Sequence, residues 1–194
     1  MAYEIYAFFV RLAARILFDL RIHGLEHLPA SGGVVVAANH KSFWDPPIIA
    51  LVISHVRKAY FMAKSELFRN LVFDAFMRFN GARPLKRGAN DIGAVRAALD
   101  LLNKGETLVV FPEGTRRVEG SLTNFLSGVG FLAAKAKAPI VPAYLSDFVS
   151  FPRFRQKVSI SFGHPIYPKG KDIKQEKDAL TQQTLNAIRE LSHE

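Results

Sequence analysis

Seven short runs rich in valine, isoleucine and aromatic residues recur along the chain, and stretches of helical periodicity separate most of them. The predicted strands cover residues 20–23, 33–38, 58–63, 82–85, 107–111, 139–145 and 157–162. The predicted helices cover residues 46–54, 67–79, 91–103, 124–137 and 173–191. Strands that alternate with helices are typical of an α/β fold around a largely parallel sheet. We therefore expect an α/β sandwich whose central sheet of about seven strands is flanked by helices.

The chain shows no internal division. Its 194 residues contain no repeat, no low-complexity tract and no linker, and about 150 residues is typical of one domain. We therefore expect a single domain over residues 1–194. A short segment that contains Pro29 and Gly33 joins residues 21–28 to the predicted strand at 33–38. Such a connection favours an antiparallel pair of strands at the edge of the sheet.

The basic residues are concentrated in the middle of the chain. The formal net charge is +9, and the segment from Arg57 to Arg117 holds twelve basic and six acidic side chains. An excess of this sign favours anionic partners, namely phosphate esters, nucleic acid or an acidic membrane surface. The alternative is a basic surface that only contacts solvent.

Residues 3–20 predict an amphipathic helix. Large apolar side chains dominate this segment, and its charged residues recur at spacings that place them on one narrow stripe of a helix: Glu4, Arg11, Arg15 and Asp19. No uncharged run approaches the roughly 20 residues that span a bilayer, and no secretory cleavage site follows. Such a helix suits the plane of a membrane interface. The alternative is an ordinary helix packed on its own domain.

Several classes of site lack their defining residues. The chain has no cysteine, which excludes disulfides, cysteine-bound metals and a thiol nucleophile. It has no G-x-S-x-G motif and no phosphate-binding loop of the Walker type. Residues His23–His27 match the H-x-x-E-H zinc pattern, but that pattern requires a helix and this stretch predicts a strand. Residues Gly128–Ala133 match a dinucleotide-binding pattern without the preceding strand, so we expect small residues that let a helix approach the sheet.

A candidate catalytic pair follows the apolar strand at 33–38. His40 comes directly after that strand, and Asp45 precedes the prolines that begin the next predicted helix. In an α/β sheet this position opens onto the ligand crevice. A carboxylate on one ring nitrogen would fix the tautomer and leave the other nitrogen as a general base. The alternatives are a structural histidine and an Asp45 that serves as the N-cap of the helix, with or without orienting His40.

A second candidate site follows the strand at 107–111 and has the sequence Phe-Pro-Glu-Gly-Thr-Arg. Gly114 permits a sharp turn, and Glu113 could orient Arg116, whose guanidinium matches a phosphate bidentately. The alternative is a turn with a surface ion pair. Residues 81–87 also place cations beside a short strand. A base and anion-binding arginines without a nucleophilic serine or cysteine indicate direct transfer to the hydroxyl of a phosphate-bearing acceptor.

These motifs together resemble the glycerophospholipid acyltransferase family. The H-x4-D spacing of His40 and Asp45 and the F-P-E-G-T-R sequence of residues 111–116 occur in the family's order, with residues 81–87 between them and Val141-Pro142 after them. The likeness covers most of the chain, from about residue 20 to residue 162. It is greatest to bacterial 1-acyl-sn-glycerol-3-phosphate acyltransferases, also called lysophosphatidate acyltransferases.

The resemblance implies transfer of a fatty acyl group from acyl-CoA or acyl-carrier protein to the sn-2 hydroxyl of lysophosphatidate, which gives phosphatidic acid. His40 would be the general base and Asp45 its partner. Six residues would bind the acceptor: Arg116 and Arg87 would hold the glycerol phosphate, Glu113, Gly114 and Thr115 would shape that pocket, and Lys64 would contact the phosphate unless it is an exposed lysine at a strand end. No metal, cofactor, acyl-enzyme or nucleic acid is implied.

The resemblance further implies a membrane lipid surface as a partner and a membrane-associated enzyme on the cytoplasmic face. Two positions depart from the family's usual pattern: Lys86 precedes Arg87 where an acid is common, and Leu126 stands two residues before Gly128 where a lysine is common. Because these positions would affect headgroup choice, acylation of another lysolipid or an amino-acid-derived lipid stays open. A non-catalytic basic membrane-binding module is the alternative from another class.

Overall fold

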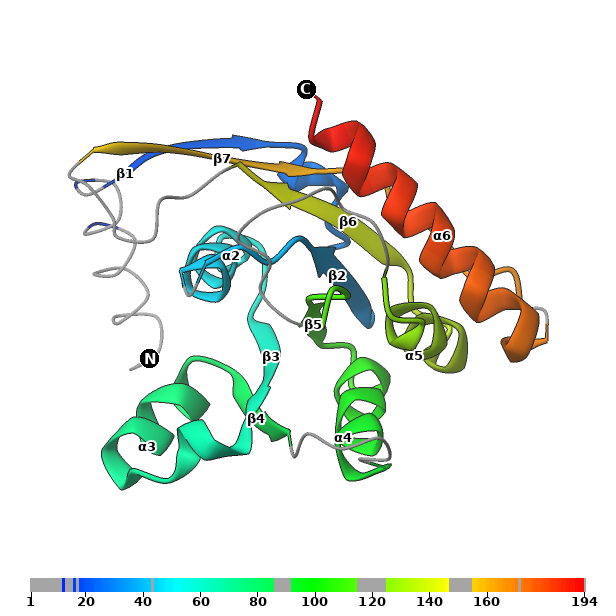
Figure 1. Cartoon of the computed structure of the whole chain (residues 1–194), viewed down its shortest axis with the longest axis horizontal. Helices are drawn as coiled ribbons and strands as arrows, with labels where there is room; N and C mark the ends of the chain where they lie inside the picture. The colour runs from blue at the N-terminus through cyan, green and yellow to red at the C-terminus, as the bar shows by residue number, and fades with distance from the viewer. Residues whose placement is uncertain are drawn as a thin grey trace.

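The fold was analysed in a computed structural model that describes Leu12, Ile16 and residues 18–42, 44–85, 92–114, 125–146, 155–170 and 172–193. Its strands form one sheet in the order β1-β7-β6-β2-β5-β3-β4 (Figure 1). Their bounds are β1 (Phe18–His23), β2 (Val34–Ala38), β3 (Ala59–Lys64), β4 (Ala82–Leu85), β5 (Thr107–Val110), β6 (Ile140–Leu145) and β7 (Gln156–Phe162). β6 and β7 pair antiparallel, and the other five pairings among these strands are parallel. The expected α/β architecture is confirmed.

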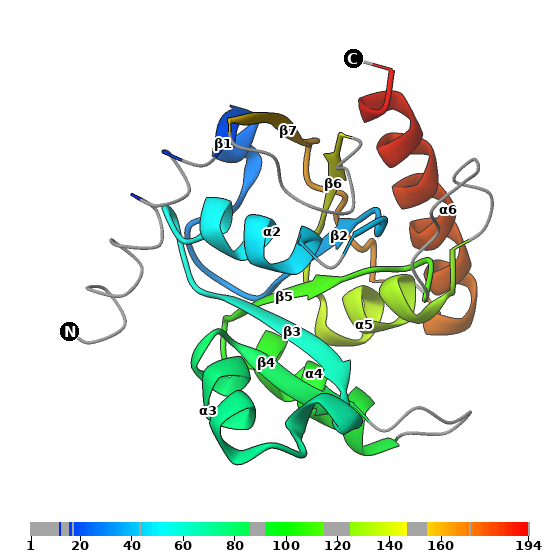
Figure 2. The same ribbon diagram turned by 60° about the vertical axis from the view of Figure 1, so that its left-hand side comes forward.

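Helices cover both faces of this sheet (Figures 1 and 2). Their bounds are α2 (Asp45–Ile53), α3 (Leu71–Phe79), α4 (Ile92–Asn103), α5 (Gly128–Ala136) and α6 (Ile173–Leu191), with short 3-10 turns η1 (Leu25–His27) and η2 (Ser65–Phe68). Within the described residues, no helix combines the length and apolar character that crossing a bilayer would need.

The central strand β2 divides the core into two clusters. Val34 and Val36 belong to the cluster that contains the buried side chains of α2. Val35 and Ala37 belong to the cluster that contains buried residues of α4, α5 and α6. Successive side chains of a strand point to opposite faces, so a strand covered by helices on both sides must be apolar throughout. All five residues of β2 are buried, as this arrangement requires.

The predicted elements lie close to the observed ones. All seven predicted strands are present, with each end within two residues, and the helix predicted at 173–191 has the observed bounds. The helix predicted at 67–79 divides into η2 and α3, and the one predicted at 124–137 is the shorter α5. The amphipathic helix predicted at 3–20 is wrong at its end, because β1 begins at Phe18. The rest of it lies outside the described residues except Leu12 and Ile16, which are helical and exposed.

The predicted antiparallel edge pair is wrong. β1 pairs in parallel with β7 at the edge of the sheet, with Phe18 opposite Gln156 and His23 opposite Ser161. β2 lies in the middle of the sheet between β6 and β5. The continuous apolar run of β2 explains this placement, because an edge strand would expose part of that surface.

The expected contact of the glycine-containing helix also differs. A Cβ placed on Gly130 would lie 2.0 Å from the carbonyl oxygen of Lys177 in α6. The glycine therefore allows a close approach between two helices, α5 and α6, rather than between a helix and the sheet.

Candidate active site

His40 and Asp45 form a hydrogen-bonded pair where β2 ends. Nδ1 of His40 lies 2.9 Å from Oδ2 of Asp45. The Asp45 side chain is 2% exposed, whereas the His40 side chain keeps 18% of its surface accessible. Because a carboxylate oxygen can only accept, Nδ1 is the donor, and the neutral ring carries its lone pair on Nε2. This is the arrangement expected of an oriented general base.

The Asp45 carboxylate also organises the loop that carries the histidine. Its Oδ2 accepts backbone N–H groups from Lys41 and from Ser42, both at 2.7 Å. Asp45 is the first residue of α2, and Trp44 occupies the N-cap position without a capping side-chain bond. The prediction that Asp45 is the N-cap is therefore wrong, because its side chain turns back to the loop. The prediction that it orients His40 agrees with this geometry.

The two sequence motifs meet at this point. The backbone N–H of His40 donates to Oε1 of Glu113 at 3.0 Å, and the His40 ring stacks on the Phe111 ring at a centroid distance of 4.2 Å. β2 and β5 are parallel neighbours, so the residues that follow them leave the sheet at the same edge. Sequence reasoning placed Glu113 beside Arg116 and did not anticipate its bond to the backbone of His40.

Asn39 fastens the end of β2 to the end of β6. Its Nδ2 donates to the carbonyl oxygen of Leu145 at 2.9 Å, and its Oδ1 accepts the N–H of Leu145 at 2.7 Å. The residue is 1% exposed. Its amide continues the ladder of backbone hydrogen bonds where the β2 backbone turns toward His40. The sequence signal that could have indicated this role is a polar residue directly after the five apolar residues of β2.

A tight turn places Glu113 beside the histidine. Gly114 has a φ of 72°, in the left-handed region that glycine adopts without strain. The N–H of Gly114 donates to the carbonyl of Phe111 at 3.1 Å, and the N–H of Leu126 donates to the carbonyl of Pro112 at 2.8 Å. The second bond brings the chain back to this turn just before α5.

A lysine that sequence reasoning did not select lies near the same edge. Nζ of Lys41 is 5.7 Å from the centroid of the Tyr144 ring, within the range of a cation–π contact. Lys41 follows His40 directly, and Tyr144 is the penultimate residue of β6. Lys41 is therefore a further cation at this edge of the sheet, with its ammonium group over β6.

The structure places only part of the predicted site. His40, Asp45, Glu113 and Gly114 come together. The backbone of Lys64 ends β3 at this edge, but its side chain is outside the described part of the structure. Arg87, Thr115 and Arg116 also lie outside the described residues, so their predicted roles stay predictions.

One basic residue of the middle segment has a structural role far from this edge. Arg57 donates to the carbonyl oxygens of Pro29 and Gly32, each at 2.8 Å, and to that of Gly105. These acceptors precede β2 and β5, so they lie at the edge opposite to His40. Burial lowers the pKa of Arg57, against the charge of Glu106. This cation holds loops together rather than a ligand.

Two further cations lie around an aromatic ring on the β3–β4 side of the sheet. Lys58 and Arg83 lie 5.4 and 5.1 Å from the centroid of Tyr60. Burial lowers the pKa of Lys58, and the charge of Arg83 adds to this effect. Burial also raises the pKa of Tyr60, with Glu106 acting in the same direction and Arg83 opposing. The basic excess of the sequence is therefore distributed over several places.

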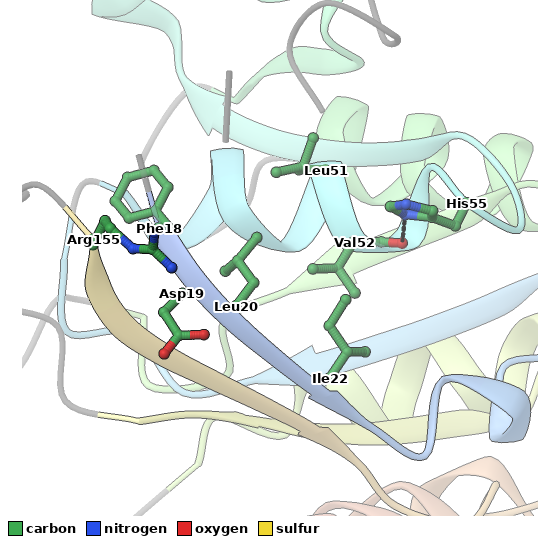
Figure 3. A pocket seen from close by; sticks show the side chains of 8 residues that line it. All are labelled: Phe18, Asp19, Leu20, Ile22, Leu51, Val52, His55 and Arg155. Carbon is green, nitrogen blue, oxygen red and sulfur yellow. Dashed lines mark hydrogen bonds between the residues drawn. The ribbon is translucent and has the colours of Figure 1, made fainter. Parts of the chain in front are cut away.

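A cavity of about 310 Å³ opens between β1 and the C-terminal half of α2 (Figure 3). Phe18 and Leu20 line it from β1, Leu51 and Val52 line it from α2, and Arg155 closes one end. None of the site residues that the structure describes, His40, Asp45, Glu113 and Gly114, belongs to its lining.

The sequence is similar to that of known enzymes. A family model described as Acyltransferase matches residues 19–146, which include His40, Asp45 and the 111–116 motif. The 1-acyl-sn-glycerol-3-phosphate acyltransferase of Bacillus subtilis is 30% identical over 162 residues, which cover 80% of this chain and 79% of that protein. The enzyme of the same name from Streptococcus pneumoniae is 28% identical over 170 residues, and the match spans 86% of this chain but 62% of the relative.

A solved structure has the same fold. The crystal structure of the 1-acyl-sn-glycerophosphate (LPA) acyltransferase PlsC from Thermotoga maritima superposes with a TM-score of 0.75 at 25% sequence identity, and the match covers 98% of this chain and 81% of that one. The family model spans well over half of the chain, including the edge where His40, Asp45 and Glu113 meet. The chain therefore belongs to the Acyltransferase family.

Proposed function

We propose that this protein transfers a fatty acyl group from acyl-CoA or acyl-carrier protein to the sn-2 hydroxyl of 1-acyl-glycerol-3-phosphate, which gives phosphatidic acid. The observation that carries the proposal is the His40–Asp45 pair, with Nδ1 and Oδ2 2.9 Å apart and the base still 18% exposed. The printed names of the relatives from Bacillus subtilis and Streptococcus pneumoniae support this choice of acceptor.

The proposed reaction is a direct transfer. Nε2 of His40 takes the proton of the acceptor hydroxyl while the hydroxyl oxygen bonds to the thioester carbonyl carbon. The carbon–sulfur bond then breaks, and the leaving thiolate takes the proton from the imidazolium. Asp45 stabilises that imidazolium through its bond to Nδ1. A base of this kind is worth about 10²–10⁴ in rate.

Arg116 and Arg87 would bind the phosphate of the acceptor, with Lys64 contributing and Thr115 shaping the pocket. The support is that Glu113, in the turn at Gly114, lies beside His40, and that Arg116 is three residues later in the sequence. Replacing Arg116 by Ala should raise the KM for lysophosphatidate roughly 10-fold or more, because charge-assisted bonds to phosphate contribute about 1.5–3 kcal/mol. Arg96→Ala, on the exposed side of α4, is the control. An effect confined to the acyl donor would contradict this role.

The reaction as proposed uses no cofactor and no metal. Since its acceptor is a membrane lipid, the enzyme would work at a lipid surface on the cytoplasmic face, and the amphipathic sequence pattern of residues 3–17, before β1, supports membrane association. Nucleic acid has no place in this function.

The test is a thiol-release assay with acyl-CoA and a panel of acceptors. We expect free CoA to form with lysophosphatidate and to form slowly without it. Turnover of another lysolipid or an amino-acid-derived lipid while lysophosphatidate is inert would refute the acceptor assignment. The absence of release with every acceptor and both donors would favour a non-catalytic membrane-binding module.

A further inference from the structure

Helix α3 exposes an apolar face. Leu71, Ala75 and Phe79 recur every fourth residue and so lie along one side of the helix. All three are exposed, and Leu71, at 84%, is the most exposed large apolar side chain among the described residues. A single exposed leucine needs no explanation, but a line of apolar residues along a whole helix indicates contact with something other than water.

This helix lies at the margin of the molecule. It packs beside β4, the last strand of the sheet, and lies apart from α4, α5 and α6 (Figures 1 and 2). Of the α3 side chains that the structure describes, those of Leu71, Asp74, Ala75 and Met77 to Phe79, none belongs to either of the two core clusters.

Positive charge surrounds the apolar face. Arg69 is exposed just before the helix, and Arg78 is exposed in its last turn, on the same side as Leu71 and Ala75. Arg78 is held in place by Asp74, with Nε and Oδ1 2.8 Å apart, and by the ring of Phe68 at 5.3 Å. Apolar side chains beside cations match a membrane interface with anionic phosphate headgroups.

The helix also starts close to the edge of the candidate active site. β3 runs parallel to β5 and ends at Lys64, so η2 leaves the sheet at the edge where His40 lies, and α3 follows two residues after η2. A lipid contact through the apolar face of α3 would therefore hold the edge that carries His40 near the membrane surface.

We propose that the Leu71–Ala75–Phe79 face of α3 binds an anionic lipid bilayer as an interfacial contact, in addition to any contact made by residues 3–20. The inference rests on the proposed function only in taking the acceptor to be a membrane lipid. Leu71 enters the acyl boundary, while Arg69 and Arg78 contact headgroup phosphates. A probe placed on α3 therefore detects this contact separately from any contact made by residues 3–20.

The absence of cysteine allows a direct test. The full chain with Leu71→Cys carries a single environment-sensitive NBD label, and Ile92→Cys is the matched control, because Ile92 is 72% exposed on α4, across the sheet from α3. Each is mixed with vesicles of phosphatidylcholine alone or with added phosphatidylglycerol. We expect the emission at position 71 to rise roughly twofold or more and to shift to shorter wavelength, most strongly on the anionic vesicles, with no change at position 92.

A second pair of variants measures binding. Leu71→Glu should weaken sedimentation with anionic vesicles by about 10-fold or more, since it removes a leucine from the acyl boundary, and Ile92→Glu should not. An unchanged signal at position 71 on vesicles that bind the protein overturns the proposal. So does a change without vesicles that grows with protein concentration, because that result assigns the face to a second copy of the chain. No acyl donor is present, so the outcome is independent of whether acyl transfer occurs.

Discussion

Three neighbours fix the position of His40. Asp45 holds one ring nitrogen, Glu113 holds the backbone N–H, and Phe111 packs against the ring face. A ring that is hydrogen-bonded at one nitrogen and packed on one face, on an anchored backbone, keeps one orientation, so Nε2 points in one direction before any substrate binds. Such preorganisation avoids reorganisation during the reaction.

The Glu113 bond gives the first prediction. Glu113→Gln keeps an oxygen acceptor for the His40 N–H, so we expect kcat within about 10-fold of the wild type, whereas Glu113→Ala should lower kcat by about 10- to 100-fold, the range for a lost bond to a charged group. The measurement is kcat and KM for acceptor in the thiol-release assay. If Gln is as damaging as Ala, the charge of Glu113 matters, as it would if its partner were Arg116.

The hydrogen-bonded pairing of His40 with Asp45 could be predicted because both residues lie in one local segment. Four residues separate His40 from Asp45 at the end of an apolar strand, and a turn of that length can bring them together. Glu113 is 73 residues from His40, and its bond depends on β2 and β5 being neighbours, which no local pattern states.

At the scale of elements, Asn39 joins the ends of β2 and β6, two strands that are far apart in the sequence. Asn39→Ala would leave the N–H and carbonyl of Leu145 without these bonds in a buried place. At about 1–3 kcal/mol for each of the two unsatisfied groups, we expect the free energy of unfolding to fall by roughly 2–6 kcal/mol. Urea denaturation measures this loss, and Asn103→Ala, exposed at the end of α4, is the control. Equal stability of the two variants would show that the bridge contributes little.

The packing of α6 depends on one glycine. Gly130→Ala would place a methyl group 2.0 Å from the carbonyl of Lys177, so α5 and α6 must move apart, at a cost of about 1–3 kcal/mol. Gly128→Ala, two residues earlier, meets nothing within 4 Å and should leave stability unchanged or slightly higher. Thermal unfolding distinguishes them. If the two variants have the same Tm, the close contact between α5 and α6 is not required for stability.

The strands and helices were easier to predict than the pairing and packing between them. The apolar runs of β2 and β6 predict buried strands because every residue must be covered on both faces. The partner of β1 could not be predicted, because Phe18 pairs with Gln156 near the other end of the chain. Gly130 signalled a close approach, but the sequence does not say to which element.

At the scale of the whole molecule, the sheet brings two motifs that are distant in the sequence to one edge. The basic residues, in contrast, lie at several separate places in the fold. Arg57 binds loops at the opposite edge, Lys58 and Arg83 surround Tyr60, and Arg78 is held on α3. Composition predicted an anionic partner but could not tell a structural arginine from one available to a ligand. That distinction depends on which carbonyl groups the fold places beside each guanidinium.

The central claim is that His40 acts as the base for an acceptor hydroxyl at the edge where the two motifs meet. The most direct measurement is acceptor-dependent release of CoA by wild-type protein and by His40→Ala, with circular dichroism to confirm that the variant is folded. We predict a loss of about 10²–10⁴ in kcat for the variant. A folded His40→Ala protein that releases CoA at the wild-type rate when lysophosphatidate is added would contradict the claim.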